Sequence, residues 1–182
     1  MDETMTKLGV AGRSIRLATD EELPLLQDIE EAAGRPFAEI GMTAVAEDEA
    51  PSTGYLRTFV TDGRAWVYPD AADRPIAYLI ADIIDGNAHI EQVSVRPEHA
   101  GRRIGRALIE HLAAWAAERA LPALTLTTFT EVPWNAPYYE RLGFRRLAAD
   151  EETPGLRALR AAEADHGLDR WPRCCMRRDL PA

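Results

Sequence analysis

Four arginines gather in one short segment that also contains two glycines, and arginine in that setting binds anions. The arginines are Arg96, Arg102, Arg103 and Arg106. The only acid among them is Glu98, so the segment carries a local charge of +3 in a chain whose formal net charge is −9. Because guanidinium groups pair well with phosphate oxygens, the segment predicts a site for an anionic ligand.

A strand and a helix are expected on either side of this loop. Residues 89–95 are β-rich and stop before Pro97, which cannot extend a ladder. Gly101 and Gly105 punctuate the loop, and apolar residues then return at helical spacing. They are Ile104, Leu108, Leu112 and Trp115. A helix that begins in such a loop has unpaired backbone N–H groups at its start, and these attract phosphate.

The rest of the chain alternates short strands with helices. Strands are expected at residues 14–18, 65–68, 75–84, 123–129, 144–147 and 173–178, and helices at 20–34, 52–62, 102–120, 136–142 and 154–167. Residues 35–50 are expected to be irregular. The strand at 75–84 is apolar on both faces and should lie inside the sheet, and Asp85-Gly86-Asn87 should form the hairpin turn after it. The last two strands should pair, with the last helix between them in sequence.

Composition indicates a soluble globular protein of one domain. Hydrophobic residues make up 46% of the 182 residues and charged residues 28%. No apolar run approaches the ~20 residues that span a membrane, and no export signal is seen, so the cytoplasm is the expected location. Cys174 and Cys175 are adjacent and lack metal-site spacing, so neither a disulfide scaffold nor a metal site is expected.

The negative charge is concentrated at the start of the chain. Residues 1–50 contain twelve acids and four bases, a balance of −8. General nucleic-acid binding needs an extended basic face, so it is not expected. Acidity near a binding site would instead attract a cationic ligand.

Two motifs together resemble the GNAT superfamily of N-acetyltransferases. The run from Val95 to Leu108, VRPEHAGRRIGRAL, is similar to the acyl-CoA loop of that superfamily, which usually reads Arg/Gln-x-x-Gly-x-Gly/Ala. Here Ala100 and Arg103 depart from the pattern and Gly105 keeps it. The run from Tyr139 to Phe144, YERLGF, resembles the Tyr-Glu-Lys-Leu-Gly-Phe signature of the same superfamily.

The resemblance covers roughly residues 14–179 and implies the GNAT fold. That fold is α/β, with a mixed central sheet and helices on both faces. We expect one such domain at residues 14–182, behind a flexible N-terminal tail at residues 1–13. A homodimer is left open.

The resemblance also implies acetyl-CoA as cosubstrate. The expected cofactor-binding residues are Val93, Val95, Gly101, Arg102, Arg103, Ile104, Gly105, Arg106, Ala107, Asn135 and Tyr138. Asn135 has an alternative role as the N-cap of a helix. Arg103 would cost about 1 kcal/mol or more if its φ were positive, and otherwise its side chain can reach a phosphate.

Acetyl transfer needs a neutral amine, and an alkylamine of pKa near 10.4 is about 99.9% protonated at pH 7. Strand alternation would place His89, Glu91 and Val93 on one face. GNAT enzymes often draw their base from this strand, so Glu91 and His89 are the candidates, directly or through water. The alternatives are a structural hydrogen bond for Glu91 and a surface position near the hairpin for His89.

The departing thiolate needs stabilisation, and Tyr139 occupies the position of the usual tyrosine acid of the superfamily. Tyr138 lies about 100° away on the helix, so one tyrosine should face the cofactor and the other the core. The resemblance thus implies direct attack by a small-molecule or peptide amine, a cationic one if the acidic stretch borders its site. An acyl-CoA-binding sensor without turnover, supported by Ala100 and Arg103, and an interaction domain without cofactor are the alternatives.

Overall fold

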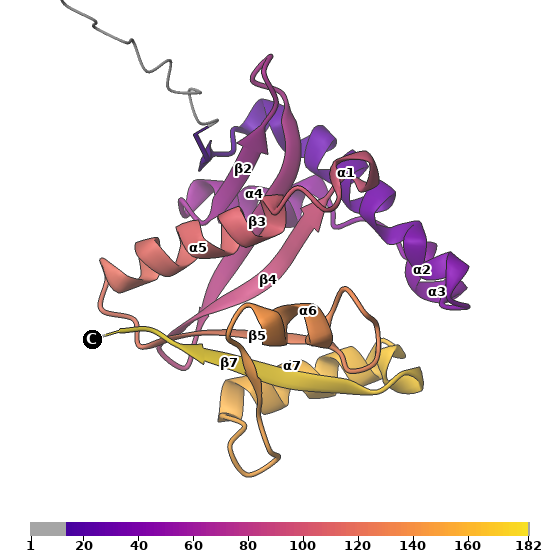
Figure 1. The fold of residues 1–182 in the computed structure, drawn as a ribbon, viewed down its shortest axis with the longest axis vertical. Helices are drawn as coiled ribbons and strands as arrows, with labels where there is room; N and C mark the ends of the chain where they lie inside the picture. The colour runs from indigo at the N-terminus through magenta and orange to yellow at the C-terminus, as the bar shows by residue number, and fades with distance from the viewer. Residues whose placement is uncertain (1–13, 182) are drawn as a thin grey trace, which may run out of the picture.

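The computed structural model describes residues 14–181, which form one seven-stranded sheet (Figure 1). The expected tail at residues 1–13 lies outside the described residues. The strands are β1 (Arg16–Leu17), β2 (Ala65–Pro69), β3 (Pro75–Ile84), β4 (Asn87–Val95), β5 (Ala123–Phe129), β6 (Arg145–Arg146) and β7 (Arg173–Asp179). Their order across the sheet is β1-β2-β3-β4-β5-β7-β6. Only β4 and β5 pair in parallel, so the described sheet is mixed, as the sequence predicts.

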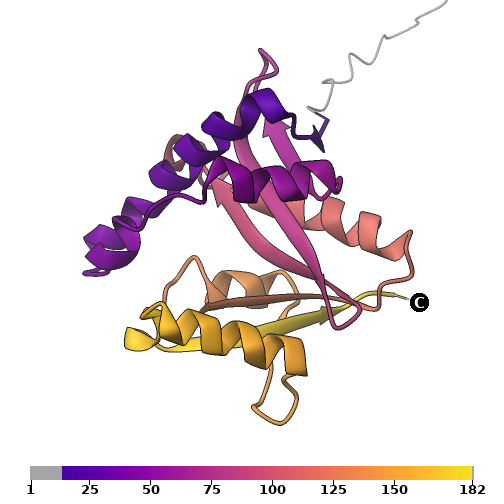
Figure 2. The same ribbon diagram turned by 180° about the vertical axis from the view of Figure 1, so that it is seen from behind.

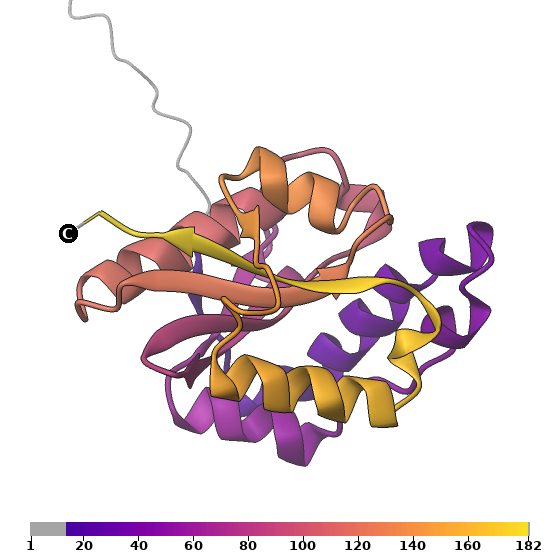
Figure 3. The same ribbon diagram turned by 90° about the horizontal axis from the view of Figure 1, so that it is seen from below.

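Helices cover both faces of the sheet (Figures 1 and 2). They are α1 (Leu23–Gly34), α2 (Pro36–Glu39), α3 (Thr43–Ala46), α4 (Thr53–Thr61), α5 (Ile104–Ala117), α6 (Ala136–Arg141) and α7 (Pro154–Asp165). Three 3-10 turns are η1 (Asp20–Glu22), η2 (Pro97–His99) and η3 (Leu168–Arg170). One core cluster packs α5 and α6 on one face, and a second packs α1 and α4 on the other. In the view from below, α7 lies on the same side as α4 (Figure 3).

The acidic N-terminal part of the chain is more helical than expected. A capping box between Thr19 and Glu22 begins η1 and α1, and Ser52 accepts the N–H of Tyr55 at the start of α4. The expectation that residues 35–50 are irregular is wrong, because α2 and α3 lie there. Each is a single turn, which is too short to show a helical period in the sequence. The first strand is also shorter than predicted.

The hairpin of β3 and β4 contains a β-bulge. Its turn is tight, with positive φ at Asp85 (48°) and Gly86 (78°). Ile80 faces Gln92, yet the next residue of β3, Ala81, faces Ile90. Glu91 is therefore an extra residue on β4, and the alternation of side chains shifts there by one position.

The sheet divides between β4 and β5. Their pairing is limited to Ala88 with Leu124 and His89 with Thr125, after which the two strands diverge (Figure 1). Beyond His89, the edge of β4 that faces β5 therefore has no partner strand in the described chain. On the far side, β7 lies between β5 and β6, which confirms the predicted pairing of the last two strands.

Candidate active site

The arginine-rich loop ends at an uncapped helix. The first α5 hydrogen bond runs from the N–H of Ala107 to the C=O of Arg103 at 3.0 Å, and no side chain of the described residues caps the helix. The preceding N–H groups are those of Ile104, Gly105 and Arg106, which therefore have no helical acceptor. This geometry suits an anion that approaches the positive end of the helix.

Two residues of the loop have left-handed backbone. Gly101 has φ of 76° and Arg103 has φ of 60°. The positive φ of Arg103 is the costly one of the two alternatives considered for it, since a side chain is strained there. Its side chain is nevertheless exposed, as are those of Arg102 and Arg106. Within residues 14–181, Arg103 and Arg106 form no salt bridge, so their charges are available to a ligand.

Gly105 allows close packing at the start of α5. A Cβ atom at this position would lie 3.1 Å from the hydroxyl oxygen of Tyr138 and 3.8 Å from Cγ2 of Val95. Any larger residue would have to push the tyrosine away. Tyr138, on α6, thus lies against the loop, half-buried and beside the core of α5.

The free edge of β4 extends away from this loop. The N–H of Arg96 bonds to the C=O of Ile76 in β3 at 3.1 Å, so alternation directs the backbone groups of Val95 and Val93 toward the opposite edge. Among residues 14–181, no strand pairs with that edge beyond His89. The edge from Val95 to Glu91 is about 13 Å long. Its unpaired amide groups can bind an extended ligand that itself contains amides.

Asn135 precedes α6 without capping it. Its side-chain amide nitrogen donates only to the C=O of Trp134, at 3.4 Å. Its Oδ1 is buried and has no partner in the part of the chain that the structure describes. A buried acceptor of this kind normally has a donor, so the capping role is not supported and a ligand contact is favoured.

Glu91 points toward α4 because of the bulge. Its carboxylate accepts a hydrogen bond from the hydroxyl of Tyr55 at 2.8 Å. Burial raises the pKa of Glu91, and the hydrogen bond from Tyr55 offsets part of that rise. The expectation that His89, Glu91 and Val93 share one face is wrong for Val93, which packs against the α5 core cluster on the other face.

His89 is a buried residue, which excludes the alternative of a surface position. Its side chain is 2% exposed, and Nδ1 lies 2.9 Å from the hydroxyl of Thr125 on β5. Burial lowers the pKa of His89 to about 4, so the imidazole is neutral at pH 7. It lies at the last pair of β4 and β5, where the two strands separate.

Tyr139 lies deeper than Tyr138. The two rings meet edge to face at 5.4 Å, and Tyr139 also contacts Phe144 at 5.8 Å. Burial and the nearby charge of Glu30 raise the pKa of Tyr139, so its phenol is protonated at neutral pH. Among residues 14–181 its hydroxyl has no hydrogen-bond partner, and it can donate to a ligand.

One half-buried carboxylate, that of Glu30, was not among the candidates. Glu30, on α1, accepts hydrogen bonds from the hydroxyl of Tyr78 at 2.9 Å and from that of Ser94 at 2.5 Å. Burial raises the pKa of Glu30 despite these donors. Glu30 directly follows the buried Ile29 on the amphipathic α1. The sequence therefore does not distinguish it from the other acids of the stretch.

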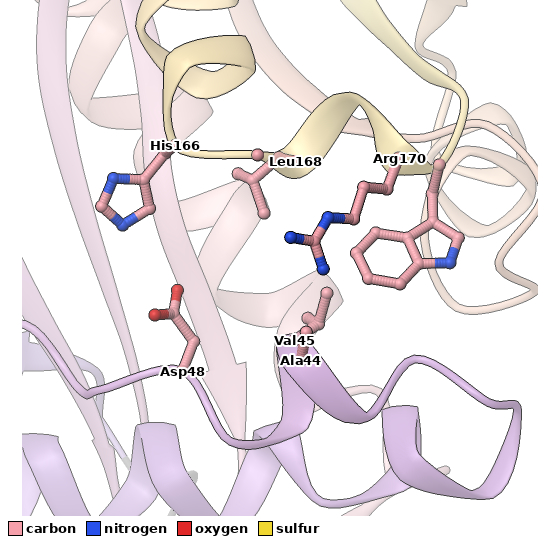
Figure 4. A pocket seen from close by; sticks show the side chains of 8 residues that line it. Ala44, Val45, Asp48, His166, Leu168 and Arg170 are labelled. Carbon is pink, nitrogen blue, oxygen red and sulfur yellow. The ribbon is translucent and has the colours of Figure 1, made fainter.

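Two hollows share Trp171 as a lining residue. The first, of about 140 Å³, lies between α3 and η3, with Asp48, His166 and Arg170 pointing into it (Figure 4). The second, of about 260 Å³, is more apolar. It is lined by Ile40, Met42, Phe129, Glu131, Val132, Pro133, Trp171 and Pro172.

Comparison with known families agrees with this geometry. Residues 25–144 match the model of the Acetyltransferase (GNAT) family. The chain belongs to the GNAT family. This confirms the resemblance stated from the two motifs, and with it the predicted fold.

Individual GNAT relatives are distant in sequence. The peptidyl-lysine N-acetyltransferase YjaB of Escherichia coli (strain K12) is 23% identical over 96 residues, which span 53% of this chain and 59% of YjaB. The ribosomal-protein-S18-alanine N-acetyltransferase of Escherichia coli is 17% identical, with a TM-score of 0.63, over 93% of this chain and 94% of its own. PaiA N-acetyltransferase of Thermoplasma acidophilum, solved with coenzyme A, is 14% identical, with a TM-score of 0.67, over 92% and 98%. These two structures share the fold.

Proposed function

We propose that this protein transfers an acetyl group from acetyl-CoA to a primary amine by direct attack. One observation carries the proposal. The uncapped, arginine-rich start of α5 leads straight onto the unpaired edge of β4, which ends at Glu91. A ligand with a phosphate group at one end and an amide-containing arm matches both parts. Acetyl-CoA has these features and carries its thioester at the end of that arm.

Each segment of the site has a separate task in binding. The N–H groups of residues 104–106 and the side chains of Arg102, Arg103 and Arg106 bind the phosphates. The backbones of Val95 and Val93 bind the arm. Asn135 uses its unpaired Oδ1 to accept a hydrogen bond from the ligand, and Tyr138 holds the loop against α6.

Glu91 is the proposed base. It lies at the end of the free edge, and burial raises its pKa, which strengthens its carboxylate as a proton acceptor. It accepts a proton from the acceptor ammonium, and the neutral amine then attacks the thioester carbon. His89 remains the second candidate. Its burial and its low pKa make it a poorer proton acceptor than Glu91.

Tyr139 is the proposed acid. Its protonated phenol donates a hydrogen bond to the departing sulfur. A thiol is more acidic than a phenol, so the sulfur can leave as a thiolate without full proton transfer.

The acceptor is proposed to be a cationic amine, either a small molecule or part of a peptide. The described part of that acidic stretch, residues 14–50, contains α1 to α3, and α3 borders the hollow that contains Asp48. Arg170 offsets Asp48 inside the hollow, so the attraction for an ammonium group comes from the acidic stretch as a whole. The names of two relatives indicate lysine side chains and an alanine residue as acceptors in those proteins, and both types belong in a screen.

Calorimetry with acetyl-CoA and an acceptor screen test the proposal together. We expect heat of binding that weakens with salt, and thiol release with at least one amine among polyamines, lysine peptides, alanine-starting peptides and acidic amino acids. Binding without turnover of any amine would instead favour a sensor. An acidic amino acid as the best acceptor would contradict the cationic assignment, and no heat at millimolar acetyl-CoA would refute the whole proposal.

A further inference from the structure

Tyr55 on α4 meets the carboxylate of Glu91 on β4. Its hydroxyl donates to Oε1 of Glu91 at 2.8 Å, across 36 positions of sequence. The residue is 43% exposed, which makes Tyr55 one of the most exposed large hydrophobic residues described. A tyrosine at the surface whose hydroxyl is nevertheless bound to a half-buried acid suggests a role for that contact.

The position of Tyr55 is held from two sides. Its N–H bonds to the hydroxyl of Ser52, the N-cap of α4, at 3.1 Å. Its ring packs edge to face on Phe59, one turn later, with 5.1 Å between the centroids. Helix start and ring packing together keep the hydroxyl over β4, so little side-chain freedom is left to lose when it binds Glu91.

The surroundings of Glu91 contain acids and one donor. Asp82 on β3 and Glu163 on α7 both raise its pKa, as burial does, and Tyr55 on α4 is the group that lowers it. No salt bridge to Glu91 is found in residues 14–181. Tyr55 is also the one side-chain donor to Glu91 within the described chain, so it alone sets the direction of that carboxylate.

We infer that Tyr55 is a positioning residue for the base, which fixes Oε1 of Glu91 and leaves Oε2 to take the proton of the acceptor. This inference rests on the proposed function. In the step concerned, an N–H bond of the acceptor ammonium breaks and an O–H bond forms at Oε2 of Glu91. The electron pair stays on nitrogen and attacks the thioester carbon.

Replacement of Tyr55 by Phe removes the hydroxyl and keeps the ring on Phe59. We expect kcat to fall about tenfold, because the carboxylate is no longer held in one direction. The KM for acetyl-CoA should stay unchanged. The acid limb of the pH profile of kcat/KM should move up by about one unit, since a carboxylate that loses a donor binds its proton more tightly. The assay uses acetyl-CoA and the best amine of the screen.

Tyr78→Phe is the matched control. It removes a tyrosine hydroxyl that donates to another acid, Glu30. We expect a lower melting temperature, while the acid limb of the pH profile of kcat/KM stays in place. An unchanged acid limb and kcat in Tyr55→Phe would overturn the positioning role. If Tyr55→Phe were unchanged in this way but Glu91→Gln lost turnover, Glu91 would remain the base and only the positioning role of Tyr55 would be rejected. Full activity of Glu91→Gln would overturn both.

A second measurement needs no acceptor. Carboxyl-carbon NMR follows the titration of Glu91 directly, with its signal identified by its loss in Glu91→Gln. We expect the pKa of Glu91 to rise in Tyr55→Phe and to stay unchanged in Tyr78→Phe. Equal titration of Glu91 in Tyr55→Phe and in the unaltered protein would refute the inference, whatever the activity.

Discussion

At the scale of single residues, burial shifts the pKa values of two side chains on β4 in opposite directions. Glu91 sits in a bulge and turns toward Tyr55, where burial raises its pKa. His89, two positions earlier, is enclosed where β4 and β5 pair. Burial disfavours the charged form of each, so it keeps His89 neutral and makes Glu91 a stronger proton acceptor than an exposed glutamate.

The burial of His89 predicts a loss of stability in mild acid. Its pKa is about 4 in the folded protein against 6.5 unfolded, so its contribution is complete above pH 6.5 and is lost as pH falls toward 4. Between pH 7 and pH 5 this amounts to about 2 kcal/mol. Urea unfolding at both pH values measures it. His89→Asn should flatten that dependence, and an equal pH dependence in both proteins would show that His89 is not responsible.

If Tyr139 is the acid, its replacement should change kcat without changing the affinity for acetyl-CoA. Tyr139→Phe should lower kcat about 100-fold, since it removes a proton donor in the transition state, and should leave acetyl-CoA affinity nearly intact. Tyr138→Phe is the control next to it. Because the Tyr138 hydroxyl touches Gly105, that change should act on acetyl-CoA affinity or on the melting temperature. If Tyr138→Phe loses turnover and Tyr139→Phe keeps it, the two roles are reversed.

At the scale of elements, the start of α5 combines a strained residue with backbone N–H groups that have no helical acceptor. Arg103 has a φ of 60°, and no side chain caps the helix. Strained backbone of this kind is concentrated at functional sites, so the strain at Arg103 is consistent with a ligand contact of its side chain or its backbone. Gly105, two residues later, contributes by the absence of a side chain, which lets Tyr138 approach the start of α5.

Arg103→Gly tests the strain directly. Glycine adopts positive φ without steric cost, so the variant should gain about 0.5–1 kcal/mol in the free energy of unfolding after the greater freedom of the unfolded chain is counted. Acetyl-CoA affinity should fall severalfold with the loss of one charge. Denaturant titration and calorimetry measure the two effects. A destabilised variant would contradict the strain, and unchanged affinity would remove Arg103 from the phosphate site.

At the scale of the whole molecule, the sheet is two parts joined by a narrow seam. The larger part holds β1 to β4 with α1, α4 and α5, and the smaller holds β5 to β7 with α7 (Figures 1 and 2). Only two register pairs connect β4 to β5. In the smaller part, Glu163 of α7 pairs with the nearly buried Arg173 of β7 at 3.1 Å. Along the seam, a bound cofactor would supply the contacts that a neighbouring strand supplies elsewhere.

Hydrogen exchange tests this view of the seam. The amides of Val93 and Val95 should exchange quickly in the free protein, because their N–H groups face the open edge, and slowly when acetyl-CoA is bound. The amide of Arg96, which bonds to the C=O of Ile76 in β3, serves as the internal control and should be protected in both states. Stabilisation by acetyl-CoA without protection of Val93 and Val95 would place the ligand elsewhere.

Much of this protein could be predicted from local patterns. The arginine loop, the hairpin turn at residues 85–87 and the YERLGF motif depend on residues close in sequence, where turn chemistry and helical spacing act directly. The fold and the family followed from them. The single-turn α2 and α3 could not be predicted, since one turn does not show a period.

Contacts between distant residues were decided by the tertiary structure alone. The bulge at Glu91 arises from how β4 pairs with β3, and it reversed the face expected for Val93. The burial of His89 depends on Thr125, and the hydrogen bonds of Tyr55 and Glu30 are made with strands 36 to 64 positions away. A sequence pattern reports which side chains share a face of one element. It contains no register between elements, and register determines which groups are buried together and hence their pKa values.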